Sequence, residues 1–251
     1  MKKYQVLWLS FLVLGFSQLF GCSGKEIDEG NVQELYTDAE DDIKDKRYLL
    51  ALDKLKTIKN KFPYSHLATQ AKLRIADVYF AEENFIEAAS AYESFRDMHP
   101  KHEKADYVIF QIGESYFNQL PGTVDRDITG ASKSIEAYRE LLTLYPKSQY
   151  ADQAKQHLAE AHEKLAGKEQ YVADFYFKRD MFDSAAARYE KITNQFSGTS
   201  VEQYAYWQWA QSLIEQEKID EARHVFRVYL ARHPHGAYAQ QASRWLDQKE
   251  R

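Results

Sequence analysis

The clearest pattern in the chain is an apolar stripe that recurs with one order of small and large residues and is followed each time by a turn. In the first copy, Ala51, Leu55 and Ile58 precede Pro63, and Ala68 follows it. Spacings of four and three residues place the small side chain and the two large ones on one face of a helix. Proline cannot continue a helix interior but fits the first turn of the next helix. The unit therefore predicts a helix, a tight turn and the start of a second helix.

Four further copies keep this order of small, large, large, turn and small residue. They are Ala88, Tyr92, Phe95, Pro100 and Ala105; Ser134, Tyr138, Leu141, Pro146 and Ala151; Ala185, Tyr189, Ile192, Ser197 and Glu202; and Ala222, Phe226, Tyr229, Pro234 and Ala239. In one copy Ser197 replaces the proline and Glu202 replaces the last small residue. The order Ala, Phe, Pro is that of the tetratricopeptide repeat, whose helix pairs bury their apolar faces only by stacking. We therefore predict an all-α fold, an α-solenoid of about five tetratricopeptide-like helix pairs with a C-terminal capping helix.

The intervals between turn positions locate a loop insertion in the third repeat. Pro63 and Pro100 are 37 residues apart, whereas Pro100 and Pro146 are 46 apart. The excess falls at residues 119–129, where proline, glycine and charged residues predict a loop. Insertions in repeat arrays map to loops on one face, often the binding face.

A second insertion has no loop composition. Pro146 and Ser197 are 51 residues apart, and the fourteen extra residues correspond to about four helical turns, which return the apolar stripe to nearly the same face. Residues 150–179 are therefore predicted to form one long helix joining two sub-arrays, with Gly167 as a candidate kink.

The other helices follow from the same periodicity. They are expected at residues 32–44, 47–61, 67–81, 85–98, 104–118, 130–144, 181–196, 201–216, 219–232 and, as a polar cap, 237–248. The predicted domains are a lipoprotein signal peptide at 1–21, a flexible tether at 22–31, N-terminal repeats one to three at 32–147, and C-terminal repeats four and five with the long helix and the cap at 148–251.

The N-terminus resembles a bacterial lipoprotein signal. Two lysines precede an apolar run at residues 6–20, which is short for a bilayer span, and Cys22, the only cysteine, follows the run directly. This resembles a lipobox, which implies a diacylglyceryl group and an N-acyl chain on Cys22. More than one acyl chain anchors a protein stably. The alternative is an ordinary secretory signal with a stray cysteine. Ser23, by resemblance to enterobacterial lipoproteins, permits sorting to the outer membrane, on its periplasmic face.

Composition and motifs argue against several function classes. The chain has 28% charged residues and a formal charge of −5, so it lacks the basic excess typical of nucleic-acid binding. It contains no phosphate-binding glycine loop, zinc-ligand spacing or nucleophile elbow. His102–Glu103 and His162–Glu163 have no second histidine four residues on. We therefore expect no enzyme activity, no catalytic residues, no metal and no cofactor other than the lipid on Cys22.

Binding surfaces remain, and aromatic residues are the candidates. A superhelix of helix pairs has a concave groove that holds extended or helical peptides. Three tyrosines of first helices are candidates to line it, or alternatively pack in the core: Tyr79, Tyr107 and Tyr116. A second candidate patch, again with core packing as the alternative, consists of Tyr204, Tyr206, Trp207 and Trp209. Two tryptophans two residues apart cannot both face one core, so at least one is expected to be partly exposed.

Taken together, the lipobox and the repeats resemble the BamD family of outer-membrane-assembly lipoproteins, over nearly the whole chain after Cys22. The most similar segments are residues 62–71, 99–113, 124–154 and 171–192. The resemblance implies a non-enzymatic scaffold of the β-barrel assembly machinery. It would bind the POTRA region of BamA through its C-terminal repeats, receive unfolded outer membrane proteins in its N-terminal groove, and act beside other assembly lipoproteins.

The matching motifs also suggest contact residues for BamA. These candidates are Asp125, Arg126, Asp127, Tyr176, Arg179 and Arg188. The guanidinium of Arg188 suits a bidentate carboxylate contact, although an ordinary solvated helix residue is the alternative. The competing interpretations are other tetratricopeptide lipoproteins, namely a pilotin for secretin or pilus assembly and a Tol-associated cell-division coordinator.

Overall fold

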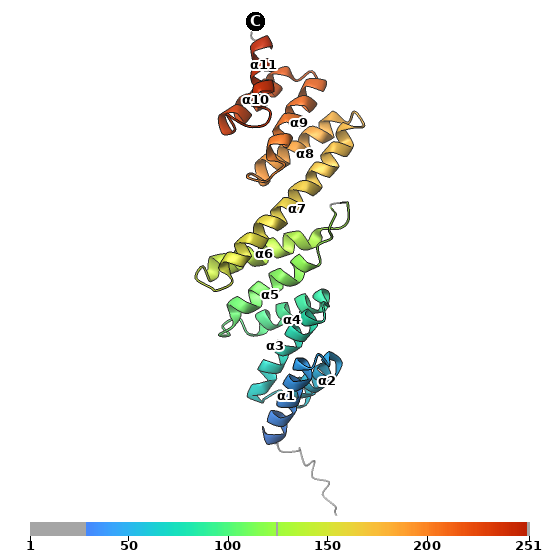
Figure 1. Ribbon diagram of the computed structural model, residues 1–251, viewed down its shortest axis with the longest axis vertical. Coiled ribbons are helices and arrows are strands. Elements are labelled where there is room, and N and C mark those ends of the chain that lie inside the picture. The colour runs from blue at the N-terminus through green and yellow to red at the C-terminus, as the bar shows by residue number, and fades with distance from the viewer. Residues whose placement is uncertain (1–28, 124, 250–251) are drawn as a thin grey trace, which may run out of the picture.

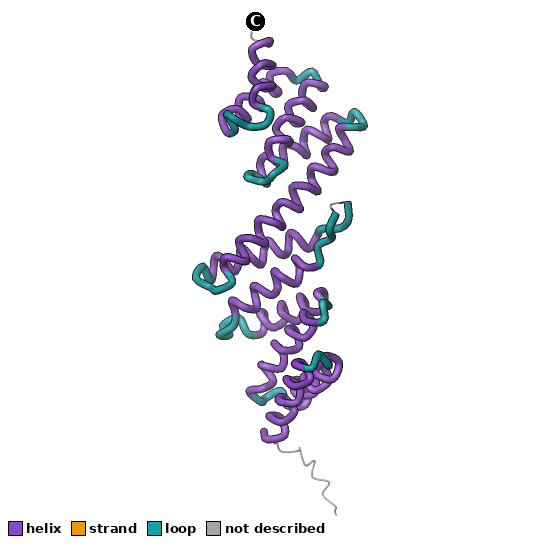
Figure 2. The backbone as a smooth tube through the Cα atoms, viewed as in Figure 1, coloured by secondary structure: helices purple, strands orange, loops and turns teal. Residues whose placement is uncertain are grey.

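The predicted helix pairs form and stack into an elongated solenoid (Figure 1). The structure is a computed structural model and describes residues 29–123 and 125–249. Its helices are α1 (Glu29–Lys44), α2 (Tyr48–Lys61), α3 (His66–Ala81), α4 (Phe85–Met98), α5 (Ala105–Asn118), α6 (Thr129–Leu144), α7 (Ala151–Phe177), α8 (Phe182–Gln195), α9 (Glu202–Glu215), α10 (Ile219–Arg232) and α11 (Ala239–Lys249). Across these ranges Figure 2 shows helices and loops and no strand.

The first helix begins earlier than the sequence indicated. The predicted signal peptide and the lipidation candidate Cys22 lie outside the described residues. However, α1 begins at Glu29, so residues 29–31 are helical and the tether prediction is wrong for them. These residues lack apolar periodicity, but extending an existing helix needs only one further backbone hydrogen bond per residue, not a buried side chain.

The repeated apolar positions form the core. The small residue of every copy (Ala51, Ala88, Ser134, Ala185 and Ala222) has no exposed surface, and the two large residues that follow it are buried in each copy. Each helix packs on the next one in the chain, and α1 also lies beside α3. At Gly113 a Cβ atom would lie 2.5 Å from the Tyr138 ring, so the close approach of α5 and α6 requires glycine there.

The turn after α8 departs from the others, and its two unusual residues compensate for each other. Glu202 is buried and accepts hydrogen bonds from Ser197 Oγ (2.9 Å) and from the Gly198 backbone N–H (2.9 Å). Gly198 adopts φ +82°, which side chains disfavour. The carboxylate that breaks the small-residue column therefore satisfies the polar groups of a turn that has no proline.

The inserted loop between α5 and α6 lies against the long helix α7. α7 is continuous through Gly167. Lys164 Nζ donates to the Pro121 carbonyl (3.2 Å), and Lys168 Nζ donates to the Asp125 carbonyl (3.2 Å), so the loop between α5 and α6 is held against α7. None of the helices in the described part of the chain is long and apolar enough to cross a bilayer.

Candidate functional site

The first helix of each pair carries one polar residue at the same repeat position. These residues are Glu40, Asp77, Glu114, Asp174 and Gln211, on α1, α3, α5, α7 and α9. The first three are 37 residues apart, as are the last two, and the longer step between Glu114 and Asp174 contains both insertions. The position therefore belongs to the repeat itself, and four of its five members are acidic.

These carboxylates accept hydrogen bonds from tyrosines of the second helices. Where the first large residue of the stripe is tyrosine, its hydroxyl reaches the carboxylate of its own repeat: Tyr92 to Asp77 (2.7 Å), Tyr138 to Glu114 (2.6 Å) and Tyr189 to Asp174 (2.6 Å). In the last pair the large residue is Phe226, which has no hydroxyl, and the polar position is Gln211, which has no charge. A buried hydroxyl needs an acceptor, so each of these three tyrosines has an acid in its own repeat. The first repeat has the acid Glu40 but Leu55 at the tyrosine position, and Arg74 bonds Glu40 instead.

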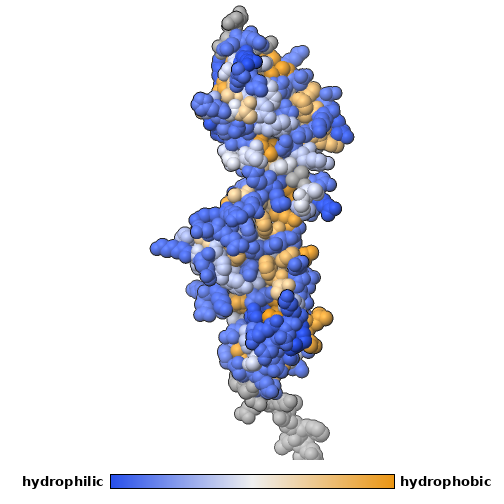
Figure 3. All heavy atoms as spheres, in the orientation of Figure 1, coloured by the Kyte–Doolittle hydropathy of each residue, from blue (hydrophilic) through white to orange (hydrophobic). Residues whose placement is uncertain are grey.

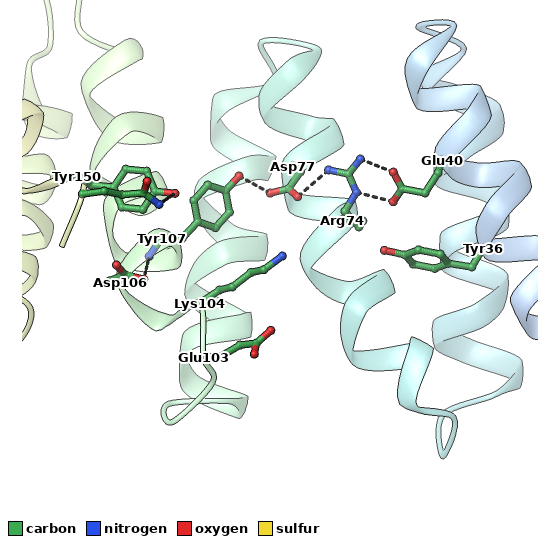
Figure 4. A pocket seen from close by; sticks show the side chains of 10 residues that line it. Tyr36, Glu40, Arg74, Asp77, Glu103, Lys104, Asp106, Tyr107 and Tyr150 are labelled. Carbon is green, nitrogen blue, oxygen red and sulfur yellow. Dashed lines mark hydrogen bonds and ion pairs between the residues drawn. The ribbon is translucent and has the colours of Figure 1, made fainter.

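Asp77 is the centre of a larger polar network beside a surface hollow (Figure 4). Its Oδ1 also accepts a hydrogen bond from the Tyr107 hydroxyl (2.8 Å), and its Oδ2 accepts one from Arg74 Nη1 (3.0 Å). Arg74 in turn binds Glu40 through two parallel hydrogen bonds of 2.7 and 2.8 Å. The network thus ties α1, α3, α4 and α5 together, and bidentate geometry makes the Arg74–Glu40 pair specific.

The hollow has a volume of about 570 Å³ and opens where three repeats meet. Its lining residues are Tyr36, Glu40, Arg74, Asp77, Glu103, Lys104, Asp106, Tyr107, Gln149 and Tyr150. The ring centroids of Tyr107 and Tyr150 are 5.8 Å apart. A concave site with aromatic walls and charges of both signs suits an unfolded polypeptide, because it offers ring surfaces and polar contacts together.

Burial and neighbouring charges shift the pKa values of Glu40, Tyr36 and Tyr107 beside the hollow. Burial opposes ionisation of Glu40, but the hydrogen bonds and positive charge of Arg74 outweigh it and lower the pKa of Glu40 below its usual 4.5. Burial and the charge of Glu40 raise the pKa of Tyr36 to about 12, and burial with the charge of Asp77 raises the pKa of Tyr107 to about 12. At neutral pH Glu40 is therefore a charged acceptor, and Tyr36 and Tyr107 are neutral donors.

The network of the third repeat is almost entirely buried. Glu114 is 7% exposed, and its Oε1 accepts from the Tyr138 hydroxyl and lies 2.6 Å from His157 Nδ1. The His157 ring stacks on Phe117 with centroids 4.6 Å apart. These contacts join α5, α6 and the start of α7, so they hold the N-terminal repeats to the long helix.

The structure brings only one of the three groove candidates to the hollow. Tyr107 lines it. Tyr116 is 9% exposed and donates to Glu93 Oε1 (2.8 Å), while Tyr79 packs between the first two apolar clusters. A role of any of the three in binding a polypeptide stays a prediction.

The candidate contact residues of the C-terminal half lie along α7, its loop and α8. Arg179 stacks on the Phe175 ring, with 3.6 Å between Cζ and the ring centroid. Phe175 is 44% exposed. Neither Arg179 nor the exposed Arg126 makes an ion pair with any described residue, whereas Arg188 Nη1 is paired with Glu169 (2.8 Å).

The other candidates in this half differ in exposure. Asp125 and Asp127 are exposed, and the Asp127 carboxylate accepts from the Thr129 N–H and hydroxyl at the start of α6. Hydrogen bonds from Thr123 and from its own backbone lower the pKa of Asp125, and those from Thr129 lower the pKa of Asp127. Tyr176 is partly buried against the apolar cluster of α7 and α8.

The aromatic patch of α9 is largely part of the core. Tyr206 is buried, while Tyr204, Trp207 and Trp209 are partly buried and pack on the C-terminal apolar clusters. The ring of Trp207 stacks on Tyr238 with centroids 5.4 Å apart.

Figure 3 shows that hydrophilic side chains cover most of the face it presents, with apolar patches mainly along one edge of the lower half. Within the described residues, no group of three or more histidine, cysteine or acidic side chains is placed to hold a metal ion.

Sequence reasoning missed Arg74, Asp77 and Asp174, although a signal for them exists. Residues 74–80 read RIADVYF and residues 171–177 read YVADFYF, 97 positions later. Tyrosines follow each aspartate at 15 and 30 residues. The small, large and turn positions that define the repeat do not include this polar column, so they do not predict it.

Comparisons with known proteins agree with the fold and with the lipoprotein resemblance. A family model described as an outer membrane lipoprotein, YfiO, matches residues 28–207, and a tetratricopeptide repeat model matches residues 204–236. The outer membrane protein assembly factor BamD of Neisseria meningitidis is 31% identical over 178 residues, 67% of each chain. The protein of that name in Vibrio cholerae is 26% identical over 78% of this chain and 85% of its own. That of Rickettsia prowazekii is 24% identical over 96% and 97%.

Proposed function

The chain belongs to the YfiO/BamD family of outer membrane lipoproteins, and on this premise we propose that it is a non-enzymatic scaffold of the β-barrel assembly machinery, held by a lipid on Cys22 at the periplasmic face of the outer membrane. The observation that carries the proposal is the family match over residues 28–207, which includes the first four helix pairs. The hydrogen-bonded network of Asp77 supports it, because this network borders the hollow described above.

The C-terminal half supplies the surface proposed for BamA. Arg126 and Arg179 are exposed cations with no ion pair among the described residues, and Phe175 presents an exposed ring beside Arg179. Arginine and aromatic side chains dominate binding energies at protein interfaces. A POTRA domain with carboxylates facing these two arginines fits this surface.

The N-terminal half supplies the site proposed for unfolded outer membrane proteins. The hollow at Tyr107 and Tyr150 has rings for apolar side chains, with Lys104 and Glu103 at its margin. Because Glu40 and Asp77 are already paired with Arg74, a passing chain meets a preorganised wall at this side of the hollow and does not have to rearrange it.

Co-purification from membranes solubilised in mild detergent tests the BamA contact. We expect BamA to be recovered with the wild-type chain and to be reduced about tenfold or more with Arg179→Glu, since a reversed charge costs at least one charge-assisted contact. The matched control is Lys61→Glu, which makes the same change of charge on an exposed residue at the end of α2. Equal recovery with both variants, or recovery of a secretin in place of BamA, contradicts the proposal.

Three further variants test the roles proposed for Arg188 and for Cys22. Arg188→Glu is expected to weaken BamA recovery, and Glu169→Gln, which removes the internal partner of Arg188, shows whether the loss reflects only that broken ion pair. Cys22→Ser is expected to move the protein from the membrane fraction to the soluble periplasmic fraction. Retention of that variant in the membrane would contradict the lipid anchor.

A further inference from the structure

The two halves of the solenoid contain the same polar unit, built from the same atoms. In the second copy the Asp174 Oδ1 atom accepts from the hydroxyls of Tyr189 (2.6 Å) and Tyr204 (3.1 Å), as Asp77 Oδ1 does from Tyr92 and Tyr107. Gln208 donates to the Tyr204 hydroxyl over 3.0 Å, and Gln111 donates to that of Tyr107 over the same distance. The tyrosine rings cross nearly at right angles in both units, at centroid distances of 6.2 and 6.3 Å.

The units differ at one position, where the first has a cation and the second has none. Arg74 donates to Asp77 Oδ2 from three residues upstream, and the residue three upstream of Asp174 is Tyr171. No described residue donates a hydrogen bond to Asp174 Oδ2 or forms an ion pair with it, and the exposed Lys178, four residues on, does not pair with it either. Asp174 is thus the one acid of the repeat position with neither an arginine nor an imidazole beside it in the described structure.

The surroundings of Asp174 are open to solvent and aromatic. Asp174 is only partly buried, and Tyr171 and Phe175 on the same helix are 50% and 44% exposed. In the first unit α1 lies beside α3 and provides Glu40, which holds Arg74. A partly buried carboxylate without a cation is less favourable than a paired one, so the second unit presents an unfilled position for positive charge.

We propose that Asp174 is a docking point for an arginine presented by a partner polypeptide, whose guanidinium takes the place that Arg74 has in the first unit. Arginine fits better than lysine because its planar group donates to a carboxylate and stacks on aromatic rings at the same time. The Asp174 Oδ2 atom accepts the hydrogen bond, and the exposed rings of Tyr171 and Phe175 provide the flanking surface. This goes beyond the proposed function, since Asp174 itself belongs neither to the arginine surface proposed for BamA, which it adjoins at Phe175, nor to the hollow at Tyr107.

A peptide pair tests the docking directly. The probes are two fluorescein-labelled peptides of alanine and glycine with two phenylalanines, identical except that one has a central arginine and the other has uncharged citrulline. With the full chain in detergent, fluorescence anisotropy is expected to show about tenfold tighter binding of the arginine peptide, the size of one charge-assisted hydrogen bond. Asp174→Asn is expected to abolish this preference while keeping an acceptor for both tyrosines.

The first unit supplies the matched control, because Asp77→Asn changes a carboxylate whose cation is already internal. We expect that variant to keep the tenfold preference for the arginine peptide. Equal binding of the two peptides to the wild type, or no binding of either, overturns the proposal. Loss of the preference in Asp77→Asn to the same degree as in Asp174→Asn also overturns it.

Tyr171→Arg provides the missing cation within the chain. If the units are equivalent, the introduced guanidinium pairs with Asp174, which raises the midpoint of thermal unfolding and removes the preference for the arginine peptide. The gain in midpoint is expected to vanish in the double variant Tyr171→Arg, Asp174→Asn. An unchanged or lower midpoint for Tyr171→Arg, or full retention of the peptide preference, contradicts the equivalence of the two units.

Discussion

The hydrogen bond between Tyr92 and Asp77 is expected to couple α3 and α4, the two helices of the second repeat, strongly. The Tyr92 side chain has no exposed surface, and its hydroxyl donates to a charged carboxylate over 2.7 Å. Tyr92→Phe removes this bond but leaves Asp77 with Tyr107 and Arg74, so we expect a loss of about 1.5 kcal/mol, the low end for a bond to a charged group.

The reverse deletion is expected to cost more. Asp77→Ala leaves the Tyr92 hydroxyl without its acceptor in the core, which costs about 1–3 kcal/mol, and Arg74 loses one of its three hydrogen bonds. Tyr107 loses the same acceptor but borders the hollow, where water replaces it. We expect a total loss of about 3 kcal/mol. The double variant contains no orphaned hydroxyl, so it should lose only about 1.5 kcal/mol, less than Asp77→Ala alone, which gives a coupling energy of about 3 kcal/mol.

Urea unfolding followed by far-ultraviolet circular dichroism measures these values, provided that the denaturant slope is the same in all four proteins. The control pairs Tyr92→Phe with Asp220→Ala, an exposed acid on α10, and these losses should simply add. A coupling energy below about 0.5 kcal/mol for Tyr92 and Asp77 would refute the reasoning, because acid and tyrosine would then be independent.

Two further predictions concern single carboxylates. Glu202→Ala should reduce the free energy of unfolding by about 2 kcal/mol, because Ser197 and Gly198 lose a shared charged acceptor. Adding Ser197→Pro to this variant should restore about 0.5 kcal/mol, because proline restricts the unfolded chain. Thermal unfolding measures both changes, and the absence of a loss for Glu202→Ala would contradict the prediction. The folded-state pKa of Glu40 is lowered, so its contribution is present above its ordinary pKa of 4.5 and is lost as the pH falls through the folded value. Glu40→Gln should therefore be less stable at pH 7 and lose less stability on acidification below that pKa; parallel stability curves for variant and wild type would contradict this.

Much of the fold was predictable because the repeat is defined by a fixed order of small and large side chains along the sequence. Both ends of α4 (Phe85–Met98) and α10 (Ile219–Arg232) lie where the sequence placed them, since an apolar stripe and a turn signal bound each helix. The inserted loop and the long helix followed from the turn intervals. The start of α1 was not predictable in this way, because residues 29–31 extend the helix without any apolar signal.

The candidate site was predicted less well, since it depends on contacts between repeats. Arg74 meets Glu40 across 34 residues and Tyr107 meets Asp77 across 30. Helical periodicity shows which residues share a face of one helix, but not which polar side chains meet across two helices. Tyr116 illustrates the limit: its position on a first helix suggested the groove, whereas its hydroxyl donates to Glu93 within the stack.

The acids of the repeat position differ in how far their hydrogen-bonding capacity is used within the stack, and their partners determine this. Glu114 is buried with Tyr138 and His157, so its bonding capacity is used within the stack. Asp77 is bonded on both oxygens by tyrosines and by Arg74, so the hollow beside it presents a fixed wall. Asp174 accepts from the equivalent tyrosines, Tyr189 and Tyr204, on one oxygen, and its other oxygen has no donor among the described residues. Position 171 carries tyrosine where the first unit has Arg74, so the second unit keeps a carboxylate oxygen that the first unit uses internally.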